Sequence, residues 1–120
     1  MKTLLRLEEL LLAFLAVYLF ADLGVAWWWY PVLLLTPDLG MLGYLAGPRV
    51  GAISYNLAHH KGLAVLLFVV GGSVQIPVLH LAGLVILGHS SLDRVLGYGL
   101  KYSDSFQHTH LGMIGRATAA

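Results

Sequence analysis

The chain has 120 residues, of which 58% are hydrophobic and only 11% are charged, and its formal net charge is +1. Soluble domains carry about a quarter charged residues, and one this small cannot bury so much apolar surface, so the composition predicts an integral membrane protein. The lack of cysteine excludes disulfide bonds and thiolate metal sites, and no basic cluster points to nucleic acid as a partner.

Four apolar segments are long enough to cross a bilayer as helices, which takes roughly 20 residues each. They cover residues 4–21, 27–46, 50–70 and 74–96. Pro37-Asp38 interrupts the second of them and could be a helix break, with Asp38 capping the helix that restarts there. Glu8 and Glu9 interrupt the start of the first segment and no small-residue cleavage site follows it, so we expect a retained helix rather than a signal peptide. Short connections rich in glycine and proline make neighbouring helices antiparallel. The expected fold is an all-α, integral membrane four-helix bundle with up-down topology over residues 1–96.

The basic residues predict the orientation of this bundle. With both termini in the cytoplasm, every Lys and Arg except Lys61 falls at the cytoplasmic ends of the segments. These residues are Lys2, Arg6, Arg49, Arg94, Lys101 and Arg116. The run Trp27 to Tyr30 then lies at the opposite interface, where aromatic rings anchor well. Residues 97–120 are polar and rich in glycine, and we expect a cytoplasmic tail packed against the mouth of the bundle.

Polar residues recur at one depth within the apolar segments, where each is costly and needs a reason. At a helical rise of about 1.5 Å per residue, Asp38 lies roughly 12 Å from the inner end of its segment and His59 roughly 14 Å into the next. Glu8 lies about one turn into the first segment, whereas His89 and Asp93 occupy the inner end of the fourth. Since all four segments bring a carboxylate or an imidazole to the same half of the membrane, we expect these side chains to converge.

The helical spacing and the residue types favour a metal site. His89 and Asp93 are four residues apart and share a helical face, as do Tyr55 and His59. Imidazole and carboxylate ligands suit zinc, iron or manganese, and helix bundles build such sites from inward-facing residues. The predicted metal ligands are Asp38, His59, His89 and Asp93, with Glu8 or His110 completing the shell or acting as general base. Supporting contacts are expected from Tyr55, Asn56, Arg94 and Lys101.

Some choices stay open at the level of the sequence. Either His59 or His60 faces inward, and either Glu8 or Glu9 does so on the first segment. His80 falls near the face opposite His89 and is expected to be structural.

A resemblance to a known family rests on four stretches of sequence. These are "LLRLEELLL", "PDLGMLGYLAGPRVGAISYNLAHH", "GHSSLDRVLGYGLKY" and "FQHTHLGMIG". In this order, and over nearly the whole chain, they resemble a family of small bacterial membrane proteins known as domain of unknown function 4260. The resemblance implies a place in the bacterial cytoplasmic (inner) membrane and no established activity. The matching motif residues are Glu8, Asp38, Tyr44, Arg49, Tyr55, Asn56, His59, His89, Asp93, Arg94, Lys101, Tyr102 and His110, whereas Gly40 replaces the serine usual in the family's pattern.

A second resemblance covers two short motifs only. Pro37-Asp38 and the run from His89 to Asp93 are similar to the PD and HxxLD words of the YdjM-like inner-membrane proteins, which implies metal-dependent hydrolysis. The HRGxTHS-like motif of that group is missing, although the run from His108 to His110 resembles part of it.

Three classes of function follow. The first is a metal-dependent membrane hydrolase that acts on a lipid or amphiphile at the cytoplasmic leaflet. The alternative is a non-enzymatic membrane assembly or carrier subunit with a structural polar network, for which Gly40, Gly43 and Gly47 would support a homo-oligomer. A further alternative is a non-haem di-iron oxidoreductase acting on lipid, with a haem-binding variant that uses His59 and His89 as axial ligands.

Overall fold

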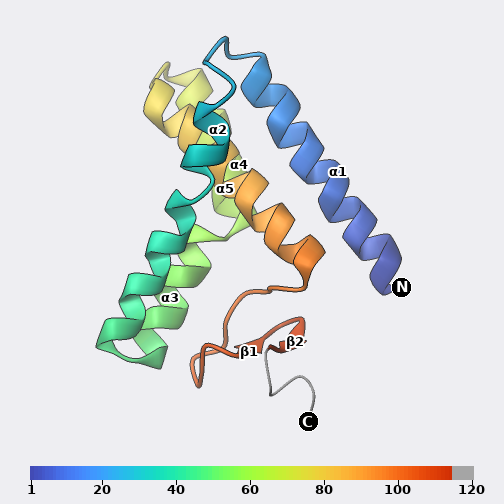
Figure 1. The fold of residues 1–120 in the computed structure, drawn as a ribbon. Helices are drawn as coiled ribbons and strands as arrows, with labels where there is room; N and C mark the ends of the chain where they lie inside the picture. The colour runs from blue at the N-terminus through green and yellow to red at the C-terminus, as the bar shows by residue number, and fades with distance from the viewer. Residues whose placement is uncertain (115–120) are drawn as a thin grey trace.

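The computed structural model describes residues 1–114, and nearly all of its regular structure is helical (Figure 1). In chain order the helices are α1 (Lys2–Ala21), α2 (Trp29–Leu33), the 3-10 helix η1 (Thr36–Ala46), α3 (Pro48–Ala58), α4 (Lys61–Ser73) and α5 (Pro77–Leu96). The short strands β1 (His108–Thr109) and β2 (Gly112–Met113) pair antiparallel as a hairpin. The predicted all-α class is confirmed, and the hairpin is an addition that the sequence did not suggest.

Helix α5 is the centre of the arrangement, because both α4 and α1 pack along it. Helices η1 and α3 pack on each other as a hairpin that extends to the lower left in Figure 1, while the β-hairpin lies below the end of α5. The hydrophobic core joins α1, α2 and α5, and it consists of Ala16, Phe20, Tyr30, Leu84 and Val85. The Tyr30 hydroxyl donates a buried hydrogen bond of 2.7 Å to the carbonyl of Leu84, which ties α2 to α5.

The helix break expected at Pro37-Asp38 within residues 27–46 is present, and it begins a few residues earlier than the proline itself. Helix α2 ends at Leu33 and η1 begins at Thr36, with Pro37 in the first turn of η1. Proline lacks the N–H that an α-helix needs at this point, and its ring clashes with the carbonyl four residues earlier, so the α-helix cannot continue through it. The break leaves the carbonyl of Leu34 available for a side chain.

The prediction of one continuous helix over residues 50–70 is wrong. Helix α3 ends at Ala58 and α4 begins at Lys61, and the two helices are bent by 45° relative to each other. His60 between them is extended, and its ring Nδ1 accepts the N–H of Leu63 at 3.0 Å. This side-chain cap satisfies one of the unpaired N–H groups at the start of α4 and so stabilises the break.

The glycines of η1 serve contacts within the chain. A Cβ at Gly43 would meet the side chain of Ser54 on α3, and the Ser54 hydroxyl donates to the carbonyl of Gly40 at 2.5 Å. Gly47 joins η1 to α3 with a φ of 114°, which side chains disfavour. In the sequence, the spacing of these glycines suggested contacts between copies of the chain. In the structure, Gly40 and Gly43 allow η1 to pack closely on α3.

The lengths of the helices bear on the predicted membrane topology. Among residues 1–114, no single helix is both long and apolar enough to cross a membrane. Helices α3 and α4, taken together as a bent pair, meet that requirement by length and composition. The four-span membrane arrangement stays a prediction. The end of the chain folds back as expected over residues 97–114, whereas residues 115–120, with Arg116, lie outside the described residues.

Candidate metal centre

The candidate site lies where the two helix breaks face α5. At the first break, the Leu34 carbonyl accepts a hydrogen bond from His89 Nδ1. At the second break, the carbonyl of His59 accepts the hydroxyl of Ser90 at 2.8 Å. Because these carbonyls have left their helical ladders, they are free to fix consecutive residues of α5. The breaks that interrupt the predicted helices thus position the site.

Four side chains from η1, the end of α3, and α5 converge there. Asp38, His59, His89 and Asp93 each offer a ligand atom, and these atoms all lie within 4.8 Å of one another. His59 Nε2 lies 3.6 Å from Asp38 Oδ1 and 3.3 Å from Asp93 Oδ2. His89 Nε2 lies 3.0 Å and 3.4 Å from the same two oxygens. The predicted convergence of these four residues is present in the structure.

Hydrogen bonds on the far side of each ring define which nitrogen faces the carboxylates. His59 Nδ1 lies 2.9 Å from the carbonyl of Tyr55, and His89 Nδ1 contacts the carbonyl of Leu34. A carbonyl only accepts, so each Nδ1 carries the proton and, in the neutral ring, each Nε2 presents a lone pair. Both Nε2 atoms are buried and make no hydrogen bond among the described residues, although carboxylate oxygens lie close to them.

The spacing of these atoms suits a divalent ion. Ligand bonds of about 2.0–2.2 Å place neighbouring ligands about 3.0–3.4 Å apart, by the geometry of tetrahedral and octahedral sites. The four imidazole–carboxylate separations, at 3.0–3.6 Å, fall in or close to that range. Two neutral imidazoles and two carboxylates would also neutralise a doubly charged ion. These residue types and separations make the cluster a candidate site for a divalent metal ion.

Tyr55 and Arg94, both predicted as supporting residues, contact this cluster directly. The Tyr55 hydroxyl donates to Asp93 Oδ2 at 3.2 Å, and its ring stacks on His59 with centroids 3.8 Å apart. Arg94 Nη2 lies 3.4 Å from the carbonyl of His59. These contacts orient one carboxylate and one imidazole, as the outer shell of a metal site does.

Asn56 and Lys101 close the site from the side of the tail. The Asn56 side-chain amide donates to the Lys101 carbonyl at 2.8 Å and accepts the Lys101 N–H at 2.6 Å. Lys101 Nζ lies over the rings of Tyr55 and Phe106, at 4.7 and 3.9 Å from their centroids. Burial lowers the pKa of Lys101 from its ordinary value, and the nearby carboxylate of Asp93 opposes that shift. The tail is thus fixed to α3 and supplies a cation beside the cluster.

A cavity of about 490 Å³ opens onto the carboxylate side of the cluster. Asp38 and Asp93 both line it, and the side chain of Asp38 is 48% exposed. The tail contributes Lys101, Phe106 and Gln107 to the same lining. The site is therefore open to a small molecule on one side and closed by helices on the other.

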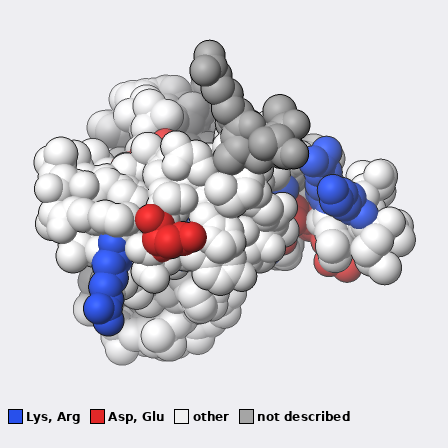
Figure 2. Space-filling model, turned by 90° about the horizontal axis from the view of Figure 1, so that it is seen from below, with Lys and Arg blue, Asp and Glu red and all other residues white. Residues whose placement is uncertain are grey.

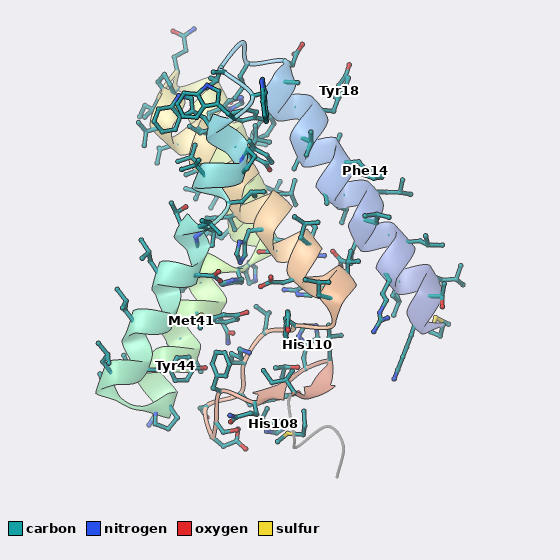
Figure 3. The ribbon with its side chains drawn as sticks, viewed as in Figure 1. Phe14, Tyr18, Met41, Tyr44, His108 and His110 are labelled. Atoms are coloured by element: carbon teal, nitrogen blue, oxygen red, sulfur yellow. The ribbon has the colours of Figure 1, made fainter. Side chains whose placement is uncertain are left out.

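The two residues predicted to complete the ligand shell lie outside the cluster. Glu8 is exposed on α1, and it is Glu9 that faces inward, where it forms an ion pair with Lys61. His110 lies beneath the end of α5 (Figure 3), and its Nδ1 accepts the N–H of Leu100 at 2.8 Å. Neither Glu8 nor His110 contributes a ligand atom to the group of four.

The remaining histidines have other partners. His60 caps α4, so of the neighbouring residues His59 and His60 it is His59 that faces the cluster. His80 Nδ1 lies 2.8 Å from the carbonyl of Phe68, which fits the structural role expected of it. His108 contacts the exposed carboxylate of Asp104 at 2.8 Å, and this hydrogen bond lowers the pKa of Asp104.

Sequence reasoning missed Ser90 and Phe106. Ser90 follows His89 directly and is completely buried, so its hydroxyl inside an apolar segment was the available signal. Phe106 lies in the polar tail, where nothing in the local pattern marks it as a partner of Lys101.

The fold and site define a class of protein, a small helical chain with an Asp–His cluster held between two helix breaks. The family profile described as domain of unknown function (DUF4260) matches residues 2–114, and the chain belongs to that family. No curated protein and no solved structure matches the chain significantly, so the resemblance to the YdjM-like proteins has no support from these comparisons.

Proposed function

We propose that the protein is a metal-dependent hydrolase of the bacterial inner membrane that acts on a lipid or amphiphile at the cytoplasmic leaflet. The observation that carries this proposal is the orientation of His59 and His89. Each ring donates Nδ1–H to a backbone carbonyl and turns a buried Nε2 toward the same two carboxylates. Without a cation or an added proton, these lone pairs and oxygens would repel one another.

The chemistry follows from the donor set and its cavity. A divalent ion held there would lower the pKa of a bound water toward neutrality and polarise a phosphoryl or acyl oxygen of the substrate. Lys101, which lines the cavity and carries an ammonium group, would bind an anionic group of that substrate. The Tyr55 hydroxyl would keep Asp93 in its coordinating orientation.

The surface of the helices supports a place in the membrane. Phe14 and Tyr18 on α1 point away from the other helices (Figure 3), and their exposed fractions are 60% and 70%. Leu66 and Val69 on α4 are likewise more than half exposed. Apolar surface of this extent is typical of contact with lipid or with another protein. Broken helices that surround a polar site are also a common device within membranes.

The distribution of charge supports the orientation. The start of α1, the end of α5 and the β-hairpin all lie at the lower end of the molecule in Figure 1, whereas α2 lies near the upper end. The lower end therefore holds Lys2, Arg6 and Arg94, and stacked Trp28 and Trp29 lie at the start of α2. A basic cytoplasmic end and an aromatic opposite end agree with the positive-inside rule.

The test is an assay for hydrolysis by the full chain in a neutral detergent. The protein is stripped with a chelator, reloaded with zinc, manganese or ferrous iron, and given a chromogenic phosphomonoester, phosphodiester and short-chain carboxylic ester. We expect one ester class to be hydrolysed only after reloading, and His89→Ala to abolish the activity. The matched control is His60→Asn, which removes an imidazole outside the cluster and keeps a capping side chain.

A folded, reloaded protein that hydrolyses none of the three ester classes would contradict the proposal. Equal activity in the stripped protein would do so as well. A change in visible absorption on reduction of the iron-loaded protein, together with a lack of hydrolysis, would instead favour the oxidoreductase alternative.

A further inference from the structure

A second cavity, with a volume of about 370 Å³, lies where α1 begins and α5 ends. Lys2, Arg6 and Glu9 line it from α1, while Arg94 comes from α5 and Leu111 from the tail. None of the four residues of the metal cluster lines this cavity. It is a separate site, and an inference about it does not depend on whether a metal is bound.

The charge of this cavity is strongly positive. Lys2, Arg6 and Arg94 all line it, and the one carboxylate in the lining, that of Glu9, forms an ion pair with Lys61. Glu9 also interacts with the charge of Arg94, so the lining carries three positive charges against one negative charge and stays net positive. Figure 2 shows basic surface on the side of the molecule at which α1 begins, with a little acidic surface close to it.

The lining also has an apolar part that continues onto the outside of the protein. Leu5 and Leu111 contribute to the cavity and are 48% and 47% exposed. Further along α1, Leu11 and Phe14 lie at other positions around the helix and are 65% and 60% exposed, so apolar surface continues beyond the cavity. A ligand with a charged head in the cavity and a hydrocarbon chain along α1 would match both kinds of surface.

We propose that this cavity binds the headgroup of an anionic phospholipid. Guanidinium groups recognise phosphate oxygens through paired hydrogen bonds, and Arg6 and Arg94 come from different helices to the same cavity. The second carboxylate oxygen of Glu9, Oε2, is buried and has no hydrogen-bond partner among the described residues. A buried acceptor of this kind calls for a donor, so the headgroup favoured is a phosphodiester that carries a hydroxyl, as in phosphatidylglycerol.

Calorimetric titration of the full chain in maltoside detergent tests this proposal. The probes are dioctanoyl phosphatidylglycerol, dioctanoyl phosphatidylcholine and inorganic phosphate. Phosphatidylglycerol is expected to bind saturably and at least about tenfold more tightly than either of the others. Arg6→Gln is expected to weaken its binding by roughly tenfold, which is the loss of one charged hydrogen-bonding partner.

The matched control is Arg49→Gln, which removes the same charge from an exposed position in the first turn of α3. This variant should bind phosphatidylglycerol like the unchanged protein. His89→Ala should do so as well, because His89 belongs to the metal cluster and does not line the second cavity. Equal weakening by Arg6→Gln and Arg49→Gln would show a diffuse electrostatic effect and overturn the proposal. Equal affinity for inorganic phosphate or for phosphatidylcholine would overturn it too, since the lipid headgroup would then not be what is recognised.

Discussion

The imidazole rings of His59 and His89 meet edge to face, with their centroids 4.8 Å apart and both Nε2 atoms facing Asp93 Oδ2. His59 lies just after α3, whereas His89 is in the second half of α5. Each ring is fixed from behind by a carbonyl, so neither can turn its Nδ1 into the cluster without losing a buried hydrogen bond. Two rings held in this way are a preorganised pair of candidate metal ligands.

Removal of one carboxylate charge should weaken metal binding strongly. In Asp93→Asn the side chain keeps its shape, but one oxygen becomes an amide and the negative charge is lost. We expect the dissociation constant for zinc to rise by more than the roughly 10- to 100-fold typical of an outer-shell change. Competition with a chromophoric chelator measures this constant. Asp104→Asn, at an exposed carboxylate of the tail, is the control and should leave the affinity unchanged.

Tyr55→Phe isolates the outer shell of the site. The substitution keeps the ring that stacks on His59 and removes only the hydroxyl that donates to Asp93. Zinc affinity should fall about 10- to 100-fold while the circular dichroism spectrum stays the same. Tyr18→Phe removes an equivalent hydroxyl from the exposed face of α1 and should have no effect. Unchanged affinity in Tyr55→Phe would mean that Asp93 needs no such support.

Asn56→Ala should release the tail from α3. The side chain makes two hydrogen bonds to the backbone of Lys101, and their loss should cost about 2 kcal/mol of docking free energy. Hydrogen exchange at the Lys101 amide reports the change directly, and we expect much faster exchange in the variant. Ser103→Ala, at an exposed position nearby, should leave exchange as it was. Equal protection in both variants would show that other contacts fix the tail.

The docking of the tail should also depend on pH through His110. Its neutral Nδ1 accepts the Leu100 N–H, and burial, aided by the charge of Arg94, lowers the pKa of His110 below its ordinary value of 6.5. The undocked tail therefore takes up a proton at a higher pH than the docked tail does. Docking is fully stable above pH 6.5 and weakens as the pH falls from there through the lowered pKa.

Hydrogen exchange at the Leu100 amide between pH 5 and 8, corrected for intrinsic rates, tests this dependence. Protection should decrease on the acid side in the unchanged protein, whereas in His110→Gln it should no longer vary with pH. His108→Gln serves as the control, because His108 pairs with Asp104 and should leave the pH dependence of Leu100 intact. A pH dependence that persists in His110→Gln would contradict the assignment.

The membership of the site was predictable because the chemistry of its residues conflicts with their surroundings. Asp38, His59, His89 and Asp93 are costly in apolar segments, and their shared depth along helices of known rise predicts that they meet. Tyr55 is predicted as a supporting residue because it lies four residues before His59, whereas Lys101 is predicted because it belongs to the family motif. Glu8 shows the limit of such reasoning, because one residue along a helix changes the face by about 100° and it is Glu9 that turns inward.

The sequence revealed one of the two helix breaks. Pro37 excludes a continuing α-helix, so the interruption between α2 and η1 was expected. The break between α3 and α4 was not, because the apolar composition continues on both sides of it and hydropathy joined the halves into one span. The break at His60 depends on the hydrogen bond from the Leu63 N–H to the His60 ring and on the Ser90 hydroxyl of α5, which donates to the carbonyl of His59. The second of these is a tertiary contact. Only the fold shows that these breaks position the cluster.

The metal content of the purified protein tests the central claim most directly. The full chain in detergent is equilibrated with zinc, freed of unbound ions by gel filtration, and measured by elemental mass spectrometry beside the double variant His59→Ala/His89→Ala and the control His60→Asn. We predict about one equivalent of zinc per chain in the unchanged protein and in the control, and next to none in the double variant. Absence of metal from the folded, unchanged protein, or the same content in the double variant, would contradict the metal centre and leave a polar network that only holds the helices together.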